Sequence, residues 1–301
     1  MLSIVTPAYN EAASLPALYA RLTAALAGLE WEWIVVDDHS ADDTFSRIQA
    51  IARNDSKVHG YRLARNCGSH AAIACGLDHA RGNAAAVMAA DLQDPPEMLP
   101  DLLARWKDGA QVVWAARQRA PKTSRVYYLL MRRVPGLDTM PPAGVGLFLI
   151  DRAVIEAFRQ FREQHTSILA LIAWMGFRQA TVAGRQEARQ HGHSGWTLRK
   201  KVALLVDSVT AFTYTPIRLM TYLGFATALL GFLYAGFVII HAIRGAPMAG
   251  WASLMVVVLV IGGIQMLMMV VLGEYLWRAL DESRRRPRYL IEDTTERGNT
   301  D

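Results

Sequence analysis

Short apolar runs alternate with polar, charged stretches along the first 215 residues of this 301-residue chain. Between several of these runs, apolar residues recur at the spacing of an amphipathic helix, as in Leu15–Leu26 and Thr44–Ile51. The runs with strand character are Leu2–Thr6, Trp33–Val36, Gly60–Leu63, Ala84–Met88 and Gln111–Trp114. Strands that alternate with helices predict an α/β fold built on a mostly parallel sheet. Ligands bind such sheets beyond the carboxyl ends of the strands, so we expect the functional side chains there.

Two long apolar runs follow the last of these strands. Leu219–Ile243 spans 25 residues and Trp251–Gly273 spans 23, and neither run contains Asp, Glu, Lys or Arg. Each is long enough to cross the roughly 30 Å hydrocarbon core of a bilayer, which predicts two transmembrane helices. A buried hairpin in the core of a soluble protein is the alternative, but two successive runs of this length disfavour it.

The segment before these runs has its own pattern. Trp196–Phe212 combines apolar residues at helical spacing with basic residues near its start, which predicts an amphipathic helix in the membrane interface. The expected organisation is a soluble domain over residues 1–195, this juxtamembrane helix over 196–215, a two-helix anchor over 216–277, and a basic then acidic tail over 278–301. After Tyr289 we expect disorder. All the predicted strands precede the apolar helices, so we expect a soluble domain that is complete before them.

Charge and cysteine content narrow the class of protein. The formal net charge of +5 and the pI near 9.3 suggest an anionic partner, but the basic residues gather beside the apolar helices. We therefore expect a membrane, and no nucleic acid, as the partner. The loop between the helices carries one charge, Arg244, whereas the segment beyond the second helix carries Arg278, Arg284, Arg285, Arg286 and Arg288. The positive-inside rule therefore predicts that both termini are cytoplasmic. No signal peptide is visible before the first strand, and two cysteines are too few for a disulfide framework.

Polar clusters follow three of the predicted strands: Thr6–Glu11, Asp37–Ser40 and Ala89–Glu97. Carboxylates at the ends of neighbouring parallel strands suit a ligand that combines a base, a ribose and phosphates. In the third cluster, Asp91 and Gln93 offer hard oxygen ligands to Mg²⁺ or Mn²⁺, with substrate phosphates completing the shell. Taken alone, each of the first two clusters is equally well explained as loop and helix-cap chemistry. The third cluster is the stronger signal, and its alternative is a cap in which the Pro-Pro pair starts a helix. Three such clusters in order favour a binding site.

These clusters carry a resemblance to a known family. Thr6-Pro-Ala-Tyr-Asn-Glu, Asp37-Asp-His-Ser, Arg65-Asn-Cys-Gly-Ser-His and Ala90-Asp-Leu-Gln-Asp-Pro-Pro-Glu resemble the ordered motifs of family 2 glycosyltransferases. Together with the segments from Gly176 and Leu272 onward, the chain more narrowly resembles the polyprenyl-phosphate glycosyltransferases, which include dolichol-phosphate mannose synthases and bactoprenol glucosyltransferases. The resemblance covers nearly the whole chain. It implies a GT-A fold, a nucleotide-sugar donor, by default a UDP-sugar, and a divalent cation, Mg²⁺ or Mn²⁺. It further implies inverting transfer to a polyprenyl phosphate, expected to be undecaprenyl phosphate, at the cytoplasmic face of a bacterial inner membrane.

The resemblance also implies residue roles. Asp91, Gln93 and Arg117 form the expected catalytic set, and Asp91 with Gln93 would hold the metal. The nucleotide-sugar would be bordered by Pro7, Tyr9, Glu11, Asp38 and Asp91, with Asp38 on the base. The acceptor phosphate would be faced by Arg117, Arg125, Arg189, Ser194 and Arg199. Each arginine alone is equally well explained as a solvated or lipid-facing cation near a membrane. No histidine is assigned a catalytic role.

Two departures from the family pattern keep a second hypothesis open. Many relatives have an acid where Ala89 stands and another near Gly146. The chain is therefore either an active enzyme or a degenerate member that binds lipid phosphate or a membrane partner without turnover. A processive polysaccharide synthase is disfavoured, because the chain has only two apolar runs and no Gln-x-x-Arg-Trp segment. A homo-oligomer is left open.

Overall fold

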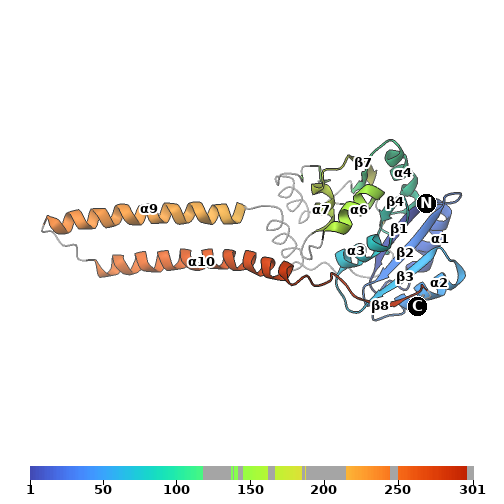
Figure 1. The fold of residues 1–301 in the computed structure, drawn as a ribbon, viewed down its shortest axis with the longest axis horizontal. Helices are drawn as coiled ribbons and strands as arrows, with labels where there is room; N and C mark the ends of the chain where they lie inside the picture. Colours follow the sequence, from blue (N-terminus) through green and yellow to red (C-terminus); the bar gives the residue numbers. More distant parts are fainter. Residues whose placement is uncertain are drawn as a thin grey trace. The chain divides into compact units, whose positions relative to one another are not determined.

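The computed structural model describes residues 1–117, 137, 139–141, 145–161, 167–184, 187, 215–244 and 250–296. The chain divides into two compact units, one comprising Met1–Val209 and Pro287–Asp301 and the other Thr210–Arg286. Figure 1 traces both along the sequence. The first unit therefore includes the C-terminal segment as well as the N-terminal part of the chain.

An eight-stranded sheet with the order β7-β5-β6-β4-β1-β2-β3-β8 runs through the first unit (Figure 1). The strands are β1 (Leu2–Ala8), β2 (Trp31–Asp37), β3 (Val58–Leu63), β4 (Ala84–Val87), β5 (Val112–Arg117), β6 (Val145–Asp151), β7 (Gln179–Gly184) and β8 (Ile291–Thr294). β1 pairs in parallel with β2 and β4, β2 with β3, and β5 with β7. β6 and β8 are antiparallel to their neighbours. The mostly parallel α/β sheet is confirmed, and each of the five strands expected from apolar runs is present.

Helices connect most of the parallel strands. They are α1 (Leu15–Ala25), α2 (Thr44–Asn54), α3 (Ser69–His79), the short 3₁₀ helix η1 (Pro96–Met98), α4 (Leu99–Lys107), α6 (Arg152–Gln160) and α7 (Ile168–Trp174). α1 buries Leu15, Leu18 and Leu22, whose spacing places them on one face. A Cβ at Gly76 of α3 would overlap the side chain of Val5, so a glycine there permits close packing of α3 on β1. This packing fixes the central strands, whose ends carry the polar clusters.

The C-terminal strand β8 contradicts two expectations. Ile291–Thr294 pairs antiparallel with β3, and the pairing is extended by hydrogen bonds from Ala64 N to Leu290 O (2.8 Å) and from Thr295 N to Gly60 O (2.9 Å). The prediction of disorder after Tyr289 is therefore wrong over this stretch, and so is the prediction that the soluble domain is complete before the apolar helices. The backbone of β8 satisfies the edge of β3, while its four residues remain exposed. An edge strand of this kind needs little apolar content, so composition alone does not reveal it.

The described residues of the second unit form two long helices, α9 (Thr215–Ile243) and α10 (Trp251–Ser283). Ile217–His241, with a mean hydropathy of 2.2, and Val256–Ser283, with 2.6, are long and apolar enough to cross a membrane. The most apolar window of each is 0% buried within the chain, unlike the core helices of a soluble protein. The two helices predicted from the apolar runs are confirmed as helices that can span a bilayer. The amphipathic helix expected over 196–215 lies outside the described residues except at its last position.

Candidate functional site at the carboxyl edge of the sheet

The topology brings distant loops to one edge of the sheet. β1 to β4 run in parallel, and because β6 is antiparallel to both β4 and β5, strands β5 and β7 run in the same direction as β4. The loops after β1, β2, β4 and β5 therefore emerge at the same edge as the start of β6. The chain builds outward from β1 to β3 and then returns to place β4 on the other side of β1. This reversal between β1 and β4 is where open α/β sheets bind ligands.

The backbone is strained in three of these loops. Asn10 (φ 55°), His39 (φ 59°) and Leu92 (φ 59°) follow β1, β2 and β4, and all three lie in the left-handed region. Among the residues whose structure is described, only Arg285 is a further non-glycine residue with positive φ. The Leu92 side chain is 1% exposed, so its burial offsets part of the cost of this backbone conformation. Strained residues of this kind persist where surrounding contacts fix the loop, and they are common at functional sites.

The loops after β1 and β2 are joined by hydrogen bonds. Asn10 N donates to Ser40 Oγ (2.9 Å), Ala41 N donates to Asn10 Oδ1 (3.0 Å), and Glu11 N donates to Thr44 Oγ1 (2.9 Å). The Glu11 carboxylate also accepts a hydrogen bond from Ser14 Oγ at 2.7 Å. The two loops therefore form one surface at the switch point.

The expected nucleotide-binding residues lie on this surface with different exposure. The side chain of Tyr9 is half exposed, and Pro7 and Glu11 are half-buried. An exposed aromatic ring at this edge offers a face for stacking a nucleobase. Tyr9 is thus accessible to a ligand.

Asp38 has a structural role that the motif did not indicate. Its two carboxylate oxygens accept hydrogen bonds from Cys67 N (2.7 Å) and Gly68 N (2.8 Å), so it holds the loop between β3 and α3. Burial raises the pKa of Asp38, while these two N–H groups oppose the shift. The Asp38 side chain is therefore engaged with backbone, and each oxygen keeps only its second lone pair for a ligand.

Asp91 lies directly beyond β4 and is 7% exposed. Its Oδ1 accepts a hydrogen bond from Gln93 N at 3.2 Å, which fixes the turn between the two expected metal ligands. Across the described part of the chain there is no group of three or more His, Cys, Asp and Glu side chains that would enclose a metal. A divalent cation held by one or two protein oxygens, with phosphate oxygens and water completing its shell, is the type of site that fits Asp91 and Gln93.

Asp94, which the sequence did not single out, is buried beside Arg117 and Gly146. Its side chain is 5% exposed, and its Oδ2 lies 3.5 Å from a terminal nitrogen of Arg117, at the end of β5. Burial raises the pKa of Asp94, and the charge of Arg117 opposes that shift. Asp94 Oδ2 and Arg117 Nε are buried without a hydrogen-bond partner among the described residues. The Asp94–Arg117 pair therefore uses only part of its hydrogen-bonding capacity. Asp94 lies in the same loop as Asp91, beyond the end of β4, and Arg117 lies at the end of β5.

Gly146, at the start of β6, lies directly beside Asp94. A Cβ built at this position would overlap the Asp94 carboxylate. Any side chain at 146 would have to displace Asp94, so the volume beside residue 146 already holds an acid contributed by another loop. The site therefore has a carboxylate beside Gly146, near the position where the resemblance leads one to expect an acid, and only the fold places it there.

The remaining acceptor-phosphate candidates, Arg125, Arg189, Ser194 and Arg199, lie outside the described residues. Of the expected residues, the structure thus brings Pro7, Tyr9, Glu11, Asp38, Asp91, Gln93 and Arg117 to one edge of the sheet.

Comparison with known proteins gives consistent matches. The model of glycosyl transferase family 2 matches residues 3–181. An undecaprenyl-phosphate 4-deoxy-4-formamido-L-arabinose transferase of Pseudomonas aeruginosa is 37% identical over 97% of this chain and 89% of its own length. The bactoprenol glucosyl transferase of Shigella phage SfV is 33% identical over 97% of this chain and 98% of its own.

A solved structure shares the fold. Glucosyl-3-phosphoglycerate synthase from Mycobacterium tuberculosis, in complex with Mn²⁺, UDP and glucosyl-3-phosphoglycerate, superposes with a TM-score of 0.52 at 17% identity. The match covers 70% of this chain and 80% of that one. The GT-A fold expected from the motifs is confirmed.

Proposed function

The chain belongs to glycosyl transferase family 2, and from this premise we propose that it transfers a sugar from a nucleotide-sugar to a polyprenyl phosphate, with inversion at the anomeric carbon. One observation carries the choice of acceptor. Relatives named for transfer to undecaprenyl phosphate or bactoprenol match 97% of this chain, so the likeness includes the two apolar helices as well as the sheet. A soluble acceptor would not require that hairpin.

The donor lies at the switch point between β1 and β4. Pro7, Tyr9 and Glu11 border the nucleotide from the joined loops, and Asp38 meets the base while it holds the β3–α3 loop. UDP is the nucleotide by default, and the solved structure with the same fold binds UDP. The exposed ring of Tyr9 stacks on the base, and the half-buried Glu11 lies where the ribose hydroxyls can donate to it.

Asp91 and Gln93 would hold a divalent cation, Mg²⁺ or Mn²⁺, together with phosphate oxygens of the donor. When bound, the cation supplies positive charge that stabilises the departing nucleoside diphosphate. Asp91 is the protein carboxylate of this arrangement, since Ala89 contributes none. A single carboxylate with phosphate oxygens is sufficient for such a cation.

The acceptor phosphate is positioned by arginines. Arg117 lies beside Asp94 at the end of β5. We assign it to the acceptor phosphate together with Arg125, Arg189, Ser194 and Arg199. A phosphate monoester loses its second proton with a pKa near 6, so at neutral pH the acceptor is largely a dianionic nucleophile. No strong general base is needed. The chain's own residues supply alignment and charge stabilisation, which together account for most of the rate enhancement of such transfers.

The two apolar helices anchor the enzyme in a membrane, which we place at the bacterial inner membrane with both termini cytoplasmic. This orientation is supported by Arg278 near the end of α10 and by Arg284, Arg285, Arg286 and Arg288 beyond it, against the single Arg244 in the interhelical loop. The anchor confines the donor site close to an acceptor whose phosphate lies in the headgroup layer, which raises the effective concentration of the two substrates for each other.

The test is direct transfer with the purified full-length protein. Radiolabelled nucleotide-sugars are incubated with undecaprenyl phosphate in liposomes and Mg²⁺ or Mn²⁺, and the lipid product is separated. We expect labelled lipid from one donor and none from the Asp91→Asn variant. A protein that binds undecaprenyl phosphate but forms no labelled lipid with any donor would instead support the degenerate member that Ala89 and Gly146 first suggested.

A further inference from the structure

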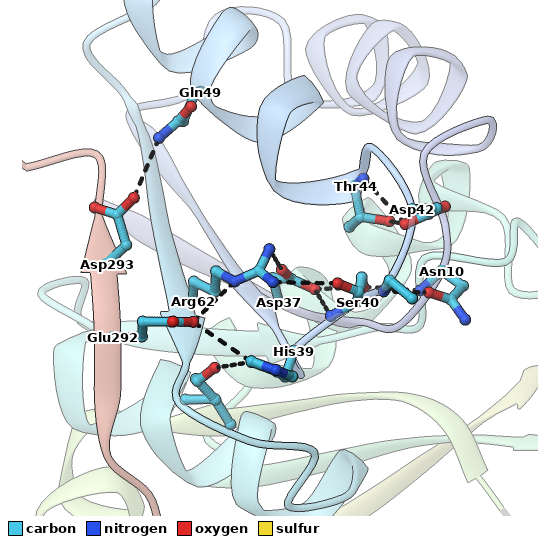
Figure 2. Close-up of polar contacts among 12 residues, drawn as sticks. Asn10, Asp37, His39, Ser40, Asp42, Thr44, Gln49, Arg62, Glu292 and Asp293 are labelled. Atoms are coloured by element: carbon cyan, nitrogen blue, oxygen red, sulfur yellow. Dashed lines mark hydrogen bonds and ion pairs between the residues drawn. The ribbon is translucent and has the colours of Figure 1, made fainter.

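The C-terminal strand β8 reaches the loop that follows β2. Figure 2 shows Glu292 of β8 facing Arg62 of β3 and His39 of that loop, while its neighbour Asp293 points to Gln49 of α2. We propose that Glu292, acting through Arg62, is a positioning residue for the donor-binding loop 37–40, so that nucleotide affinity depends on the segment after the second apolar helix. This inference rests on the proposed function.

Arg62 is held by three different acceptors. Its Nε donates to Glu292 Oε2 at 3.0 Å, one terminal nitrogen donates to Asp37 Oδ2 at 3.3 Å, and the other donates to Ser40 O at 3.2 Å (Figure 2). The guanidinium carbon lies 5.9 Å from the ring centre of Phe45. The planar fork of arginine thus fixes β8 on one side and the loop after β2 on the other.

From Arg62 the contacts continue to the β1 loop. Asp37 is fully buried, and its Oδ1 accepts hydrogen bonds from the backbone N of Ser40, at 3.0 Å, and from the Ser40 hydroxyl. Ser40 Oγ in turn accepts the hydrogen bond from Asn10 N at 2.9 Å (Figure 2). A continuous polar path therefore joins β8 to the two loops that border the proposed nucleotide site.

His39 gives Glu292 a second contact with the same loop. His39 Nδ1 lies 3.0 Å from Leu63 O and 3.4 Å from Glu292 Oε2. The carbonyl only accepts, so Nδ1 carries the proton and donates. These contacts hold the strained residue His39 in its left-handed conformation, next to Asp38.

The role of Glu292 is positional more than stabilising. Its side chain is 49% exposed, and ion pairs at such sites contribute little to folding. Without it, the Arg62 guanidinium is free to rotate away from Asp37 and Ser40 O, and the loop loses a fixed support. We expect the loss to appear in ligand binding, because a loop that must be reordered on binding weakens affinity without unfolding the domain.

The support comes from a segment in direct continuity with the membrane helices. α10 ends at Ser283 and β8 begins at Ile291. Between them, Tyr289 donates a hydrogen bond to Asp78 Oδ2 at 2.7 Å, and the Arg288 guanidinium carbon lies 5.0 Å from the ring centre of Phe158. The strand is therefore fastened to the catalytic unit immediately after the anchor.

The experiment compares neighbouring carboxylates on one strand. In the full-length protein, Glu292→Gln removes the charge that faces Arg62. Asp293→Asn removes a charge that lies 3.4 Å from the half-buried Gln49, and it keeps an oxygen that can accept the hydrogen bond from Thr294 N. Calorimetry measures binding of the tightest of UDP, GDP and dTDP with Mn²⁺, and transfer assays give KM for donor and lipid separately. We expect Glu292→Gln to weaken nucleotide binding and raise donor KM by about fivefold or more. We expect kcat, lipid KM and the unfolding midpoint to stay near wild type, and Asp293→Asn to change nothing.

A double variant tests the route through Arg62. Arg62→Lys keeps a charge but cannot span Asp37 and Ser40 O, so it should weaken nucleotide binding as Glu292→Gln does. If Glu292 acts through Arg62, the double variant should bind nucleotide as weakly as Arg62→Lys alone. Equal nucleotide affinity in the Glu292 and Asp293 variants, or fully additive losses, would overturn the inference while the proposed function stands. A folded wild-type protein that binds no nucleoside diphosphate would overturn both.

Discussion

Substitution of Gly146 by alanine tests the claim that Asp94 fills the volume beside β6. Gly146 does not have positive φ, so in open space an alanine would stabilise the strand by about 0.4–1 kcal/mol through the unfolded chain. Here the new Cβ overlaps the Asp94 carboxylate, and overpacking of a buried site costs about 1–3 kcal/mol. A loss of stability would therefore indicate that the Cβ at position 146 contacts Asp94, and a gain would indicate open space there.

We expect the clash to win. With about 2 kcal/mol for overpacking and about 0.7 kcal/mol gained through the unfolded chain, the net loss is about 1.3 kcal/mol. This loss corresponds to a fall of about 3–5 °C in the unfolding midpoint, at about 2–4 °C per kcal/mol for a domain of this size. The assay is thermal unfolding of the full-length protein in detergent, for Gly146→Ala, Asp94→Ala and the double variant. In the Asp94→Ala background, the alanine at 146 should be neutral or raise the midpoint, giving a coupling energy of about 1–3 kcal/mol. A rise in the wild-type background, or an equal fall in both, would refute the placement of Asp94.

Three further outcomes are expected. Asp91→Asn should abolish sugar transfer while the protein stays folded and membrane-bound, because it keeps the shape of the side chain and removes the charge that holds the metal. In the labelled-lipid transfer assay, a rate within threefold of wild type would contradict this role. Ala89→Asp should tighten the dependence of transfer on Mg²⁺ or Mn²⁺, and an unchanged metal titration would place residue 89 away from the cation. Burial raises the pKa of Asp94, so its ionised form costs stability above the folded pKa, and that cost fades as the pH falls toward the unfolded value of about 3.9. The midpoint of Asp94→Asn relative to wild type should therefore decline from pH 7.5 to pH 4, and a constant difference would contradict the shift.

Much of the candidate site could be predicted because its residues follow apolar strands in the sequence. The loops after β1, β2 and β4 were recognisable from clusters such as Asp91 and Gln93, and parallel strands bring such loops to one edge. The role of Asp38 could not be seen in the same way. Its partners Cys67 and Gly68 belong to a different loop, and only the packing of β3 beside β2 brings them to its carboxylate.

Local pattern therefore determined the elements, and the fold decided which of them meet. Alternating apolar runs gave five strands of the sheet, and the length of two charge-free runs gave the apolar helices, because side-chain periodicity and span length are properties of neighbouring residues. β8 could not be found this way, since Ile291–Thr294 becomes a strand only when the edge of β3 supplies its hydrogen-bond partners. The same holds for the ion pair of Arg62 with Glu292, which are 230 residues apart, and for the overlap of Gly146 with Asp94. Such contacts depend on the path of the whole chain through the sheet, and that path is fixed by tertiary packing.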